Sequence, residues 1–142
     1  MLYDEIERDQ NTHRTENAVQ LLGRLIFGGY FLYNGVNHFL NRQKMTGYAQ
    51  AKGVPKPDIA VEASGALMIL GGLSLLTGYR PKVGAALIGM FLTGVTPSIH
   101  RFWTEENPQQ RQAEMVNFMK NVALLGGALI AAGRSDSPAL AA

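Results

Sequence analysis

The sequence predicts an all-α integral membrane protein, a four-helix bundle with a short interfacial helix between its first and second spans. The chain has 142 residues, which suits a single domain. Its mean hydropathy of -0.01 resembles that of a soluble protein, but its charges are segregated. Of its 13 basic and 11 acidic residues, only Arg24, Glu62 and Lys120 fall inside four long apolar stretches. Many of the 16 glycines lie there too, where a soluble helix would be destabilised.

The first span is predicted at residues 20–40, after a polar, acidic N-terminal tail of residues 1–19. About 20 helical residues, each rising about 1.5 Å, cross a hydrocarbon core of about 30 Å. The tail has no positive n-region and no small-residue cleavage site follows the span, so we expect the span to be retained. Residues 41–52 mix apolar and polar side chains and predict a short interfacial helix that ends at Gly53.

The other spans are predicted at residues 59–79, 83–99 and 115–133, followed by a C-terminal tail of residues 134–142. A soluble bundle would show a polar outer face at about every third or fourth position, and residues 83–92 offer none. Small residues that permit close helix packing recur in these spans. They are Ala85, Gly89 and Thr93, and the pairs Gly71-Gly72 and Gly126-Gly127.

Four crossings place both termini on one side of the membrane, here named face A, and the longer loops on the other, face B. Five basic residues on face A against six on face B do not decide the orientation. Because successive spans alternate in direction, the end of spans one and three and the start of spans two and four share the leaflet next to face B. The polar residues of the spans gather there: Asn34, Asn37, His38, Glu62, Ser64, Thr96, Ser98, His100, Asn117, Lys120 and Asn121.

An ionised side chain at the centre of a membrane helix costs about 2.5–3.5 kcal/mol on insertion scales, and pairing reduces this cost. We therefore expect an ion pair between Glu62 and Lys120. The cluster is either polar packing, at about 0.6 kcal/mol per interhelical hydrogen bond, or a functional cavity. A glutamate, a lysine and two histidines are more than packing requires, which favours the cavity.

The absence of cysteine excludes disulfides, thiolate metal sites, iron–sulfur clusters and c-type haem. The basic residues are scattered rather than clustered, so no nucleic-acid partner is predicted. His38, His100 and Glu62 could in principle form a site with two histidines and one carboxylate. No metal-ligand spacing supports this arrangement, and no metal is predicted.

Several short motifs share an order and spacing with one family of membrane proteins. They are Gly23-Arg24-Leu25-Ile26-Phe27, Tyr48-Ala49, Gly53-Val54-Pro55, Glu62, Gly71-Gly72-Leu73, Gly78, His100, Lys120-Asn121 and Gly126-Gly127. Together they make residues 20–133 resemble the DoxX family of small four-helix membrane proteins. The family typically has a lysine near the end of the first span, where this chain has His38.

The resemblance implies a multi-pass protein of a bacterial-type inner membrane, with both termini cytoplasmic and face B outside. It also implies association with redox enzymes, since the related DoxD proteins are membrane subunits of thiosulfate:quinone oxidoreductase. The resemblance marks Arg24, Glu62, His100 and Lys120 as the positions of this chain that match the family pattern.

The first functional hypothesis is a redox subunit whose polar cluster binds a quinone head group. His100 or Lys120 would donate to a quinone carbonyl and Glu62 would relay the proton, so these three are the candidate catalytic residues. The candidate binding residues are Arg24, Asn34, His38, Thr96, Asn117 and Asn121. The chain carries no evident electron carrier, so any oxidoreductase activity would need partner subunits.

The alternative is a membrane anchor or scaffold without enzymatic activity, in which the cluster fixes the bundle and the loops or the acidic tail recruit partner proteins. A small-solute carrier ranks last, because four short spans leave little room for alternating access unless the chain forms homo-oligomers.

Overall fold

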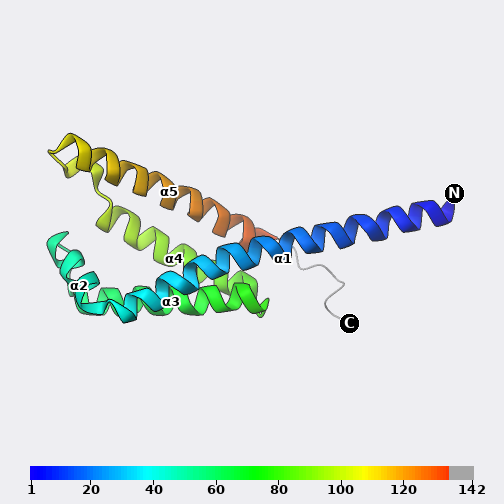
Figure 1. Ribbon diagram of the computed structural model, residues 1–142, viewed down its shortest axis with the longest axis horizontal. Coiled ribbons are helices and arrows are strands. Elements are labelled where there is room, and N and C mark those ends of the chain that lie inside the picture. Colours follow the sequence, from blue (N-terminus) through cyan, green and yellow to red (C-terminus); the bar gives the residue numbers. More distant parts are fainter. Residues whose placement is uncertain (135–142) are drawn as a thin grey trace.

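The computed structural model describes residues 1–134, and these residues form helices and turns without a strand. The helices are α1 (Leu2–Leu40), α2 (Arg42–Ala51), α3 (Pro57–Thr77), α4 (Pro81–Ile99), a single 3-10 turn η1 (Phe102–Thr104) and α5 (Pro108–Gly133), as Figure 1 shows. The predicted all-α class is therefore confirmed. The predicted C-terminal tail lies outside the described residues, apart from Arg134.

Proline and capping residues set where the later helices begin. Pro57, Pro81 and Pro108 each occupy the first position of a helix, where the missing N–H costs nothing. The side chain of Asn107 also caps α5, because it accepts hydrogen bonds from two backbone N–H groups in the first turn. The fourth span was predicted to begin at residue 115, but this cap starts α5 at Pro108. Its first two turns are polar and give no apolar signal.

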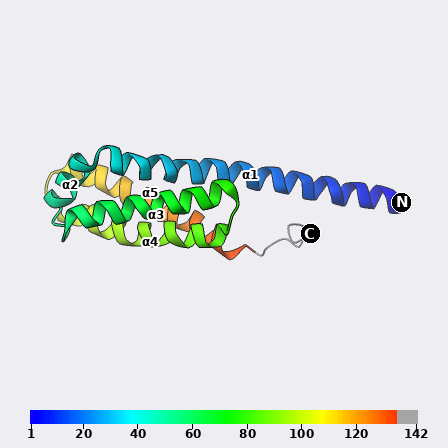
Figure 2. The same ribbon diagram turned by 90° about the horizontal axis from the view of Figure 1, so that it is seen from below.

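The predicted interfacial helix is confirmed as α2. It ends at Ala51, and Gly53 follows with a φ of 75°, a left-handed conformation that glycine adopts without strain. Contacts with α3 and with the end of α1 place α2 across one end of the bundle, as seen in Figure 2.

Helix α1 begins much earlier than the predicted span. The acidic residues 2–19 are helical and continuous with the span, and they project well beyond the other helices (Figure 2). No proline interrupts this half, and side chains four residues apart interact along it, such as His13 with Asp9 at 3.3 Å.

Three segments of the described chain are long and apolar enough to cross a membrane: Pro57–Thr77, Pro81–Thr104 and Pro108–Gly133. The second half of α1 is not among them, because Arg24 and the polar residues near its end lower its hydropathy. It nevertheless packs along α3, one of the three segments, in the antiparallel sense that a fourth crossing requires.

Helix α3 is the central element of the bundle, and it approaches both neighbours through glycines. A Cβ atom added to Gly72 would lie 2.8 Å from the carbonyl oxygen of Gly28 in α1. One added to Gly71 would lie 2.9 Å from the carbonyl oxygen of Gly84 in α4. Real Cβ atoms do not approach backbone so closely, so these two adjacent glycines let α3 contact a helix on each side.

The other small residues singled out in the sequence have different roles. No atom lies within 4 Å of a Cβ added to Gly126, and Gly127 meets only the ring of Phe27. Gly89 faces the side chain of Leu125 at 3.8 Å, and Thr93 is exposed. The expectation that these residues bring backbones together was therefore wrong, because α5 contacts α4 through larger side chains.

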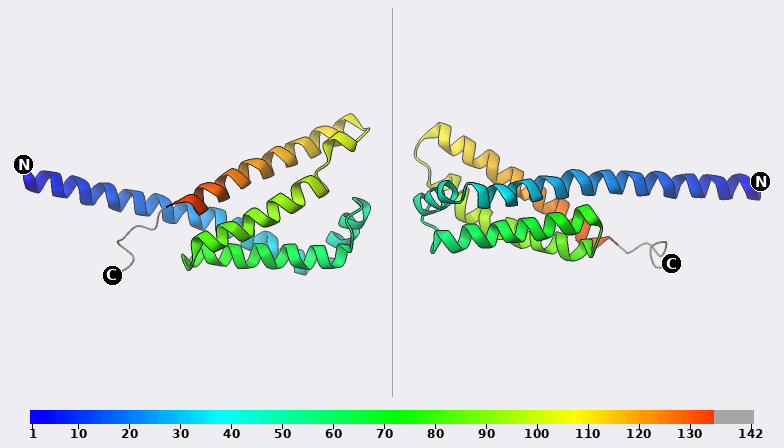
Figure 3. Two further views of the ribbon diagram at one scale, coloured as in Figure 1. Left: turned by 180° about the vertical axis from the view of Figure 1, so that it is seen from behind. Right: turned by 60° about the horizontal axis from the view of Figure 1, so that its bottom comes forward.

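The helices diverge toward the end that carries α2. Helix α1 packs on α3, α3 on α4 and α4 on α5, whereas α1 and α5 make little contact. Figure 3 shows the α1–α3 pair and the α4–α5 pair separating at this end. A core of buried apolar side chains joins the pairs nearer the opposite end: Phe31, Met68, Leu75, Ile88, Leu92 and Ala128.

Substitution of the packing glycines tests this arrangement. We expect Gly71→Ala and Gly72→Ala each to destabilise the folded protein by about 1–3 kcal/mol, since the added methyl group forces two backbones apart. Gly126→Ala is the matched control, because its methyl group enters open space and alanine favours a helix by about 1 kcal/mol. Thermal unfolding in mild detergent measures all three, and equal stability of the Gly72→Ala and Gly126→Ala variants would contradict the packing described here.

Candidate functional site

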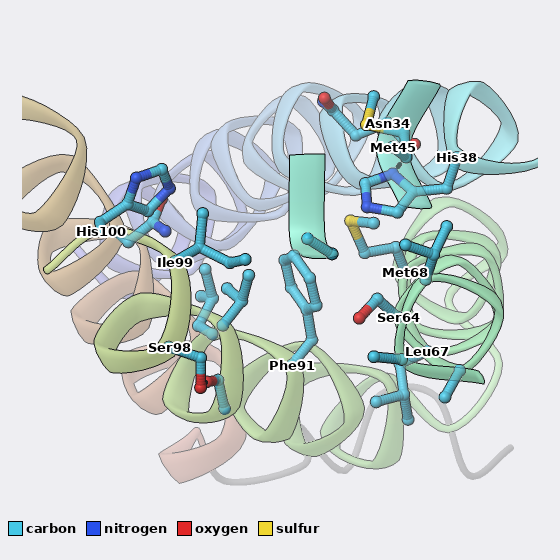
Figure 4. A pocket seen from close by; sticks show the side chains of 18 of the residues that line it. Asn34, His38, Met45, Ser64, Leu67, Met68, Phe91, Ser98, Ile99 and His100 are labelled. Atoms are coloured by element: carbon cyan, nitrogen blue, oxygen red, sulfur yellow. Dashed lines mark hydrogen bonds between the residues drawn. The ribbon is translucent and has the colours of Figure 1, made fainter. Parts of the chain in front are cut away.

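A cavity of about 450 Å³ lies between the diverging helix pairs, with residues of all five α-helices in its wall. This volume falls within the range of about 300–1,000 Å³ that small-molecule sites occupy. The wall is mostly apolar, and Figure 4 shows Met45, Met68, Leu67, Phe91 and Ile99 around the open space. A ligand in this cavity would therefore be largely apolar.

The polar residues of the wall belong to the cluster that the sequence predicted. Seven members of that cluster line the cavity: Asn34, His38, Ser64, Ser98, His100, Lys120 and Asn121. They come from α1, α3, α4 and α5, and His100 directly follows α4. Residues far apart in the sequence therefore meet in one site. The expected convergence of polar groups from four helices is thus present.

The tautomer of His38 follows from its hydrogen bond. Its Nδ1 lies 2.9 Å from the carbonyl oxygen of Asn34, which can only accept, so Nδ1 carries the hydrogen. In the neutral ring, Nε2 is then a hydrogen-bond acceptor. The ring also packs edge-on against Phe91, at a centroid distance of 6.5 Å. His38 therefore lies in the wall with Nδ1 held by Asn34 and with Nε2 able to accept a hydrogen bond from a ligand.

The adjacent residues Lys120 and Asn121 lie in the wall and have few hydrogen-bond partners. The Nζ of Lys120 has a single long contact in residues 1–134, 3.5 Å to Oδ1 of Asn117. Asn121 is only 7% exposed, and no described residue forms a hydrogen bond with its side chain. Both side chains can therefore donate hydrogen bonds to a ligand.

The expected ion pair between Glu62 and Lys120 was wrong. Glu62 lies 2.6 Å from the guanidinium of Arg42 instead, and both side chains are about half exposed, outside the cavity wall. The reason is the packing order, since α2 starts next to α3 whereas α5 packs on α4. The sequence offered no sign that Arg42 would reach Glu62 first.

Arg24, Thr96 and Asn117 also lie outside the cavity wall. Arg24 is near the opposite end of the bundle, where its Nε donates to the carbonyl of Leu75 at 3.0 Å and its guanidinium covers Gly78. This contact satisfies the C-terminal end of α3. Thr96 is buried within the bundle, and Asn117 meets Lys120 from the preceding turn.

A charged network at the α2 end was not predicted. The ammonium of Lys52 lies 2.9 Å from both Glu105 and Glu114, which ties the end of α2 to η1 and α5. Arg101 also donates to the carbonyl of Lys52. The second oxygen of Glu114 lies 2.7 Å from Nδ1 of His100, and both side chains are less than a fifth exposed. This network adjoins the cavity at His100, the one of these residues that lines it.

The network also shifts the pKa values of Lys52 and Tyr48. Burial lowers the pKa of Lys52, but its hydrogen bonds to Glu105 and Glu114 outweigh this effect and raise that pKa above its usual value. Burial and the nearby carboxylate of Glu114 both raise the pKa of Tyr48, whose hydroxyl donates to Glu114 at 3.2 Å. Lys52 is therefore held firmly in its charged form.

A second, polar hollow of about 340 Å³ adjoins the network. Its wall includes Tyr48, Lys52, Glu105, Gln110 and Glu114. Tyr48 lines both hollows, and the bond between His100 and Glu114 joins a residue of the apolar cavity to a residue of the polar hollow. Glu114 was not predicted as a site residue, because it immediately precedes the predicted fourth span. Its place on face B, with the loop that contains Lys52, was the available signal.

Comparison with known proteins gives one family. The family model for DoxX matches residues 19–101, which run from the apolar half of α1 through α2, α3 and α4. No curated protein and no solved structure matches the chain. The match covers more than half of the sequence and includes residues of four helices around the cavity, α1 to α4, while the resemblance beyond residue 101 stays a prediction. With its long apolar helices, the chain is a multi-pass membrane protein that belongs to the DoxX family.

Proposed function

We propose that this protein binds a quinone head group in the apolar cavity and acts as a membrane subunit of a redox complex. One observation carries the proposal. Asn121, a buried residue whose side chain has no hydrogen-bond partner in residues 1–134, lies beside Lys120, an exposed residue whose ammonium has only a long contact to Asn117, in a wall that is otherwise mostly apolar. A ring with a carbonyl oxygen is the ligand chemistry that satisfies both features.

The other residues of the wall can bind both the oxidised form of the ligand, the quinone, and its reduced form, the quinol. A quinone oxygen only accepts hydrogen bonds, and the ammonium of Lys120 and the amide NH2 of Asn121 can both donate to it. A quinol hydroxyl also donates, and the available Nε2 of His38 can accept from it. The rings of Tyr30, Phe31 and Phe91 line the same cavity and can pack against the flat head group.

Electrons would reach the quinone from a partner. The chain has no cysteine for an iron–sulfur cluster, and its described residues form no group of three or more metal-binding side chains. The relatives of the DoxX family that serve quinone-linked oxidoreductases favour a protein partner. The proposed setting is therefore a bacterial-type inner membrane, with both termini on the cytoplasmic side and face B, which holds the charged network, outside.

Binding of a short-chain ubiquinone tests the proposal directly. With the purified protein in lipid nanodiscs, we expect Lys120→Met to weaken binding about tenfold or more, since a hydrogen bond to a charged group contributes about 1.5–3 kcal/mol, and Asn121→Leu to weaken it about two- to tenfold, since a neutral hydrogen bond contributes about 0.5–1.5 kcal/mol. Lys44→Met is the matched control, because Lys44 is exposed on α2 and lies outside the cavity wall. Binding can be measured by quenching of Trp103, the single tryptophan.

The affinities of the two cavity variants also define the result that would contradict the proposal. Equal affinity in the wild type and in both cavity variants would exclude the cavity as the quinone site. Extraction of the native complex in mild detergent gives an independent check, since a quinone and a redox partner should both be found by mass spectrometry.

An anchor or scaffold without catalytic activity is a second candidate, and the projecting half of α1 favours it. Residues 2–19 extend beyond the bundle, are almost entirely exposed, and carry both charged and apolar side chains (Figure 1). A partner protein on face A could bind this helix.

Removal of residues 1–17 tests the second candidate. We expect the truncated protein to remain folded, because these residues contact none of the other helices, and to lose a partner that copurifies with the full chain. Pull-down followed by mass spectrometry measures this loss. Retention of every partner by the truncated protein would contradict a docking role for the projecting helix.

A further inference from the structure

We propose that His100 delivers a proton to the bound quinone and that Glu114 is the residue that positions it. This inference rests on the proposed quinone site and assigns its proton chemistry to a pair of residues at the α2 end. The sequence had given the relay to Glu62, whose side chain lies outside the cavity wall and pairs with Arg42.

The geometry orients the ring of His100. Oε2 of Glu114 lies 2.7 Å from Nδ1, and a carboxylate oxygen accepts a hydrogen bond from that nitrogen. Nδ1 is therefore held by Glu114, and Nε2 is the nitrogen left for a ligand. A carboxylate that fixes an imidazole through its second nitrogen is a recurrent way to orient a proton donor or acceptor.

Access to water distinguishes His100 from the other histidine of the wall. His38 is bound to a carbonyl of its own helix and packs against Phe91 inside the bundle. His100 instead stands where the apolar cavity meets the polar hollow that Glu114, Lys52 and Tyr48 line. A proton can therefore reach His100 from water without crossing the apolar wall.

Reduction of the quinone takes two electrons and two protons, and each carbonyl becomes a hydroxyl. The electrons come from the reduced partner protein of the proposed complex. One oxygen takes the Nε2 proton of the doubly protonated His100, which leaves a neutral ring still held by Glu114 through Nδ1. The other oxygen takes a proton from the ammonium of Lys120. Both residues then regain protons from water.

The network supplies a matched pair of substitutions. Glu105, which follows η1, and Glu114 of α5 both lie 2.9 Å from Lys52, but only Glu114 also touches His100 and Tyr48. A structural role would affect both positions, whereas a positioning role affects Glu114 alone. Glu114→Gln keeps an oxygen that can accept from Nδ1 but is neutral, and it serves as the conservative variant.

The experiment uses the full chain in nanodiscs with a bound short-chain ubiquinone and dithionite as the electron donor. Binding is measured first, and the rate of quinol formation is then followed by ultraviolet absorbance after rapid mixing. A general acid contributes about 10²–10⁴-fold to a rate, so we expect a loss of at least about tenfold in Glu114→Leu and about 100-fold in His100→Gln. Quinone affinity should change less than about threefold in both variants, because Lys120 and Asn121 still hold the ring.

Glu105→Leu should reduce the quinone at close to the wild-type rate, whereas Glu114→Gln should be slowed at least about tenfold, because a neutral amide no longer stabilises the protonated ring. Equal slowing by Glu105→Leu and Glu114→Leu would overturn the inference and make the pair structural. Full activity of His100→Gln with quinone still bound would also overturn it, while the quinone site would stand. If the wild type binds no quinone, the proposed function fails, and the inference fails with it.

Discussion

Close backbone contact on both sides of α3 is the constraint on which the rest of this molecule depends. Gly71 and Gly72 are adjacent in the sequence, yet one faces α4 and the other faces α1. Within a membrane, apolar burial gives helices little reason to associate, so contact between backbones is an important source of cohesion. Because both contacts are made at the same level of α3, the three helices are held together there. Farther along, α1 stays against α3 at Gly35 and Gly65, whereas the α4–α5 pair separates from them toward the α2 end.

The cavity is a consequence of this arrangement. Helix α5 is joined to the bundle through α4 and has little contact with α1, so the two helix pairs diverge toward the α2 end. Side chains of the core fill the narrow part, and the wide part is left with polar groups that no neighbouring helix satisfies. Lys52, Glu105 and Glu114 then connect the two sides at the water-facing end. The same divergence explains both the space for a ligand and the unpaired state of Lys120 and Asn121.

Much of this architecture could be predicted from the sequence. Segregated charge gave the helical membrane class, Gly53 marked the end of α2, and alternating span direction brought Asn34, His38, His100 and Lys120 to one site. The partners of the charged residues could not be predicted, because pairing depends on which helices touch. Glu62 was assigned to Lys120 on depth alone, but Arg42 is nearer. The length of α1 and the early start of α5 were missed because polar helical turns lack an apolar period. Glu114 was missed for the same reason.

The weak contact between α1 and α5 also determines how a ligand would arrive. The charged network lies at the α2 end, whereas Lys120 is exposed where α1 and α5 make little contact. A hydrophobic molecule would enter laterally, from within the acyl chains. Its effective concentration would then be its mole fraction in the bilayer, so adding lipid at constant ligand would dilute the ligand and lower occupancy, even though the aqueous volume had not changed.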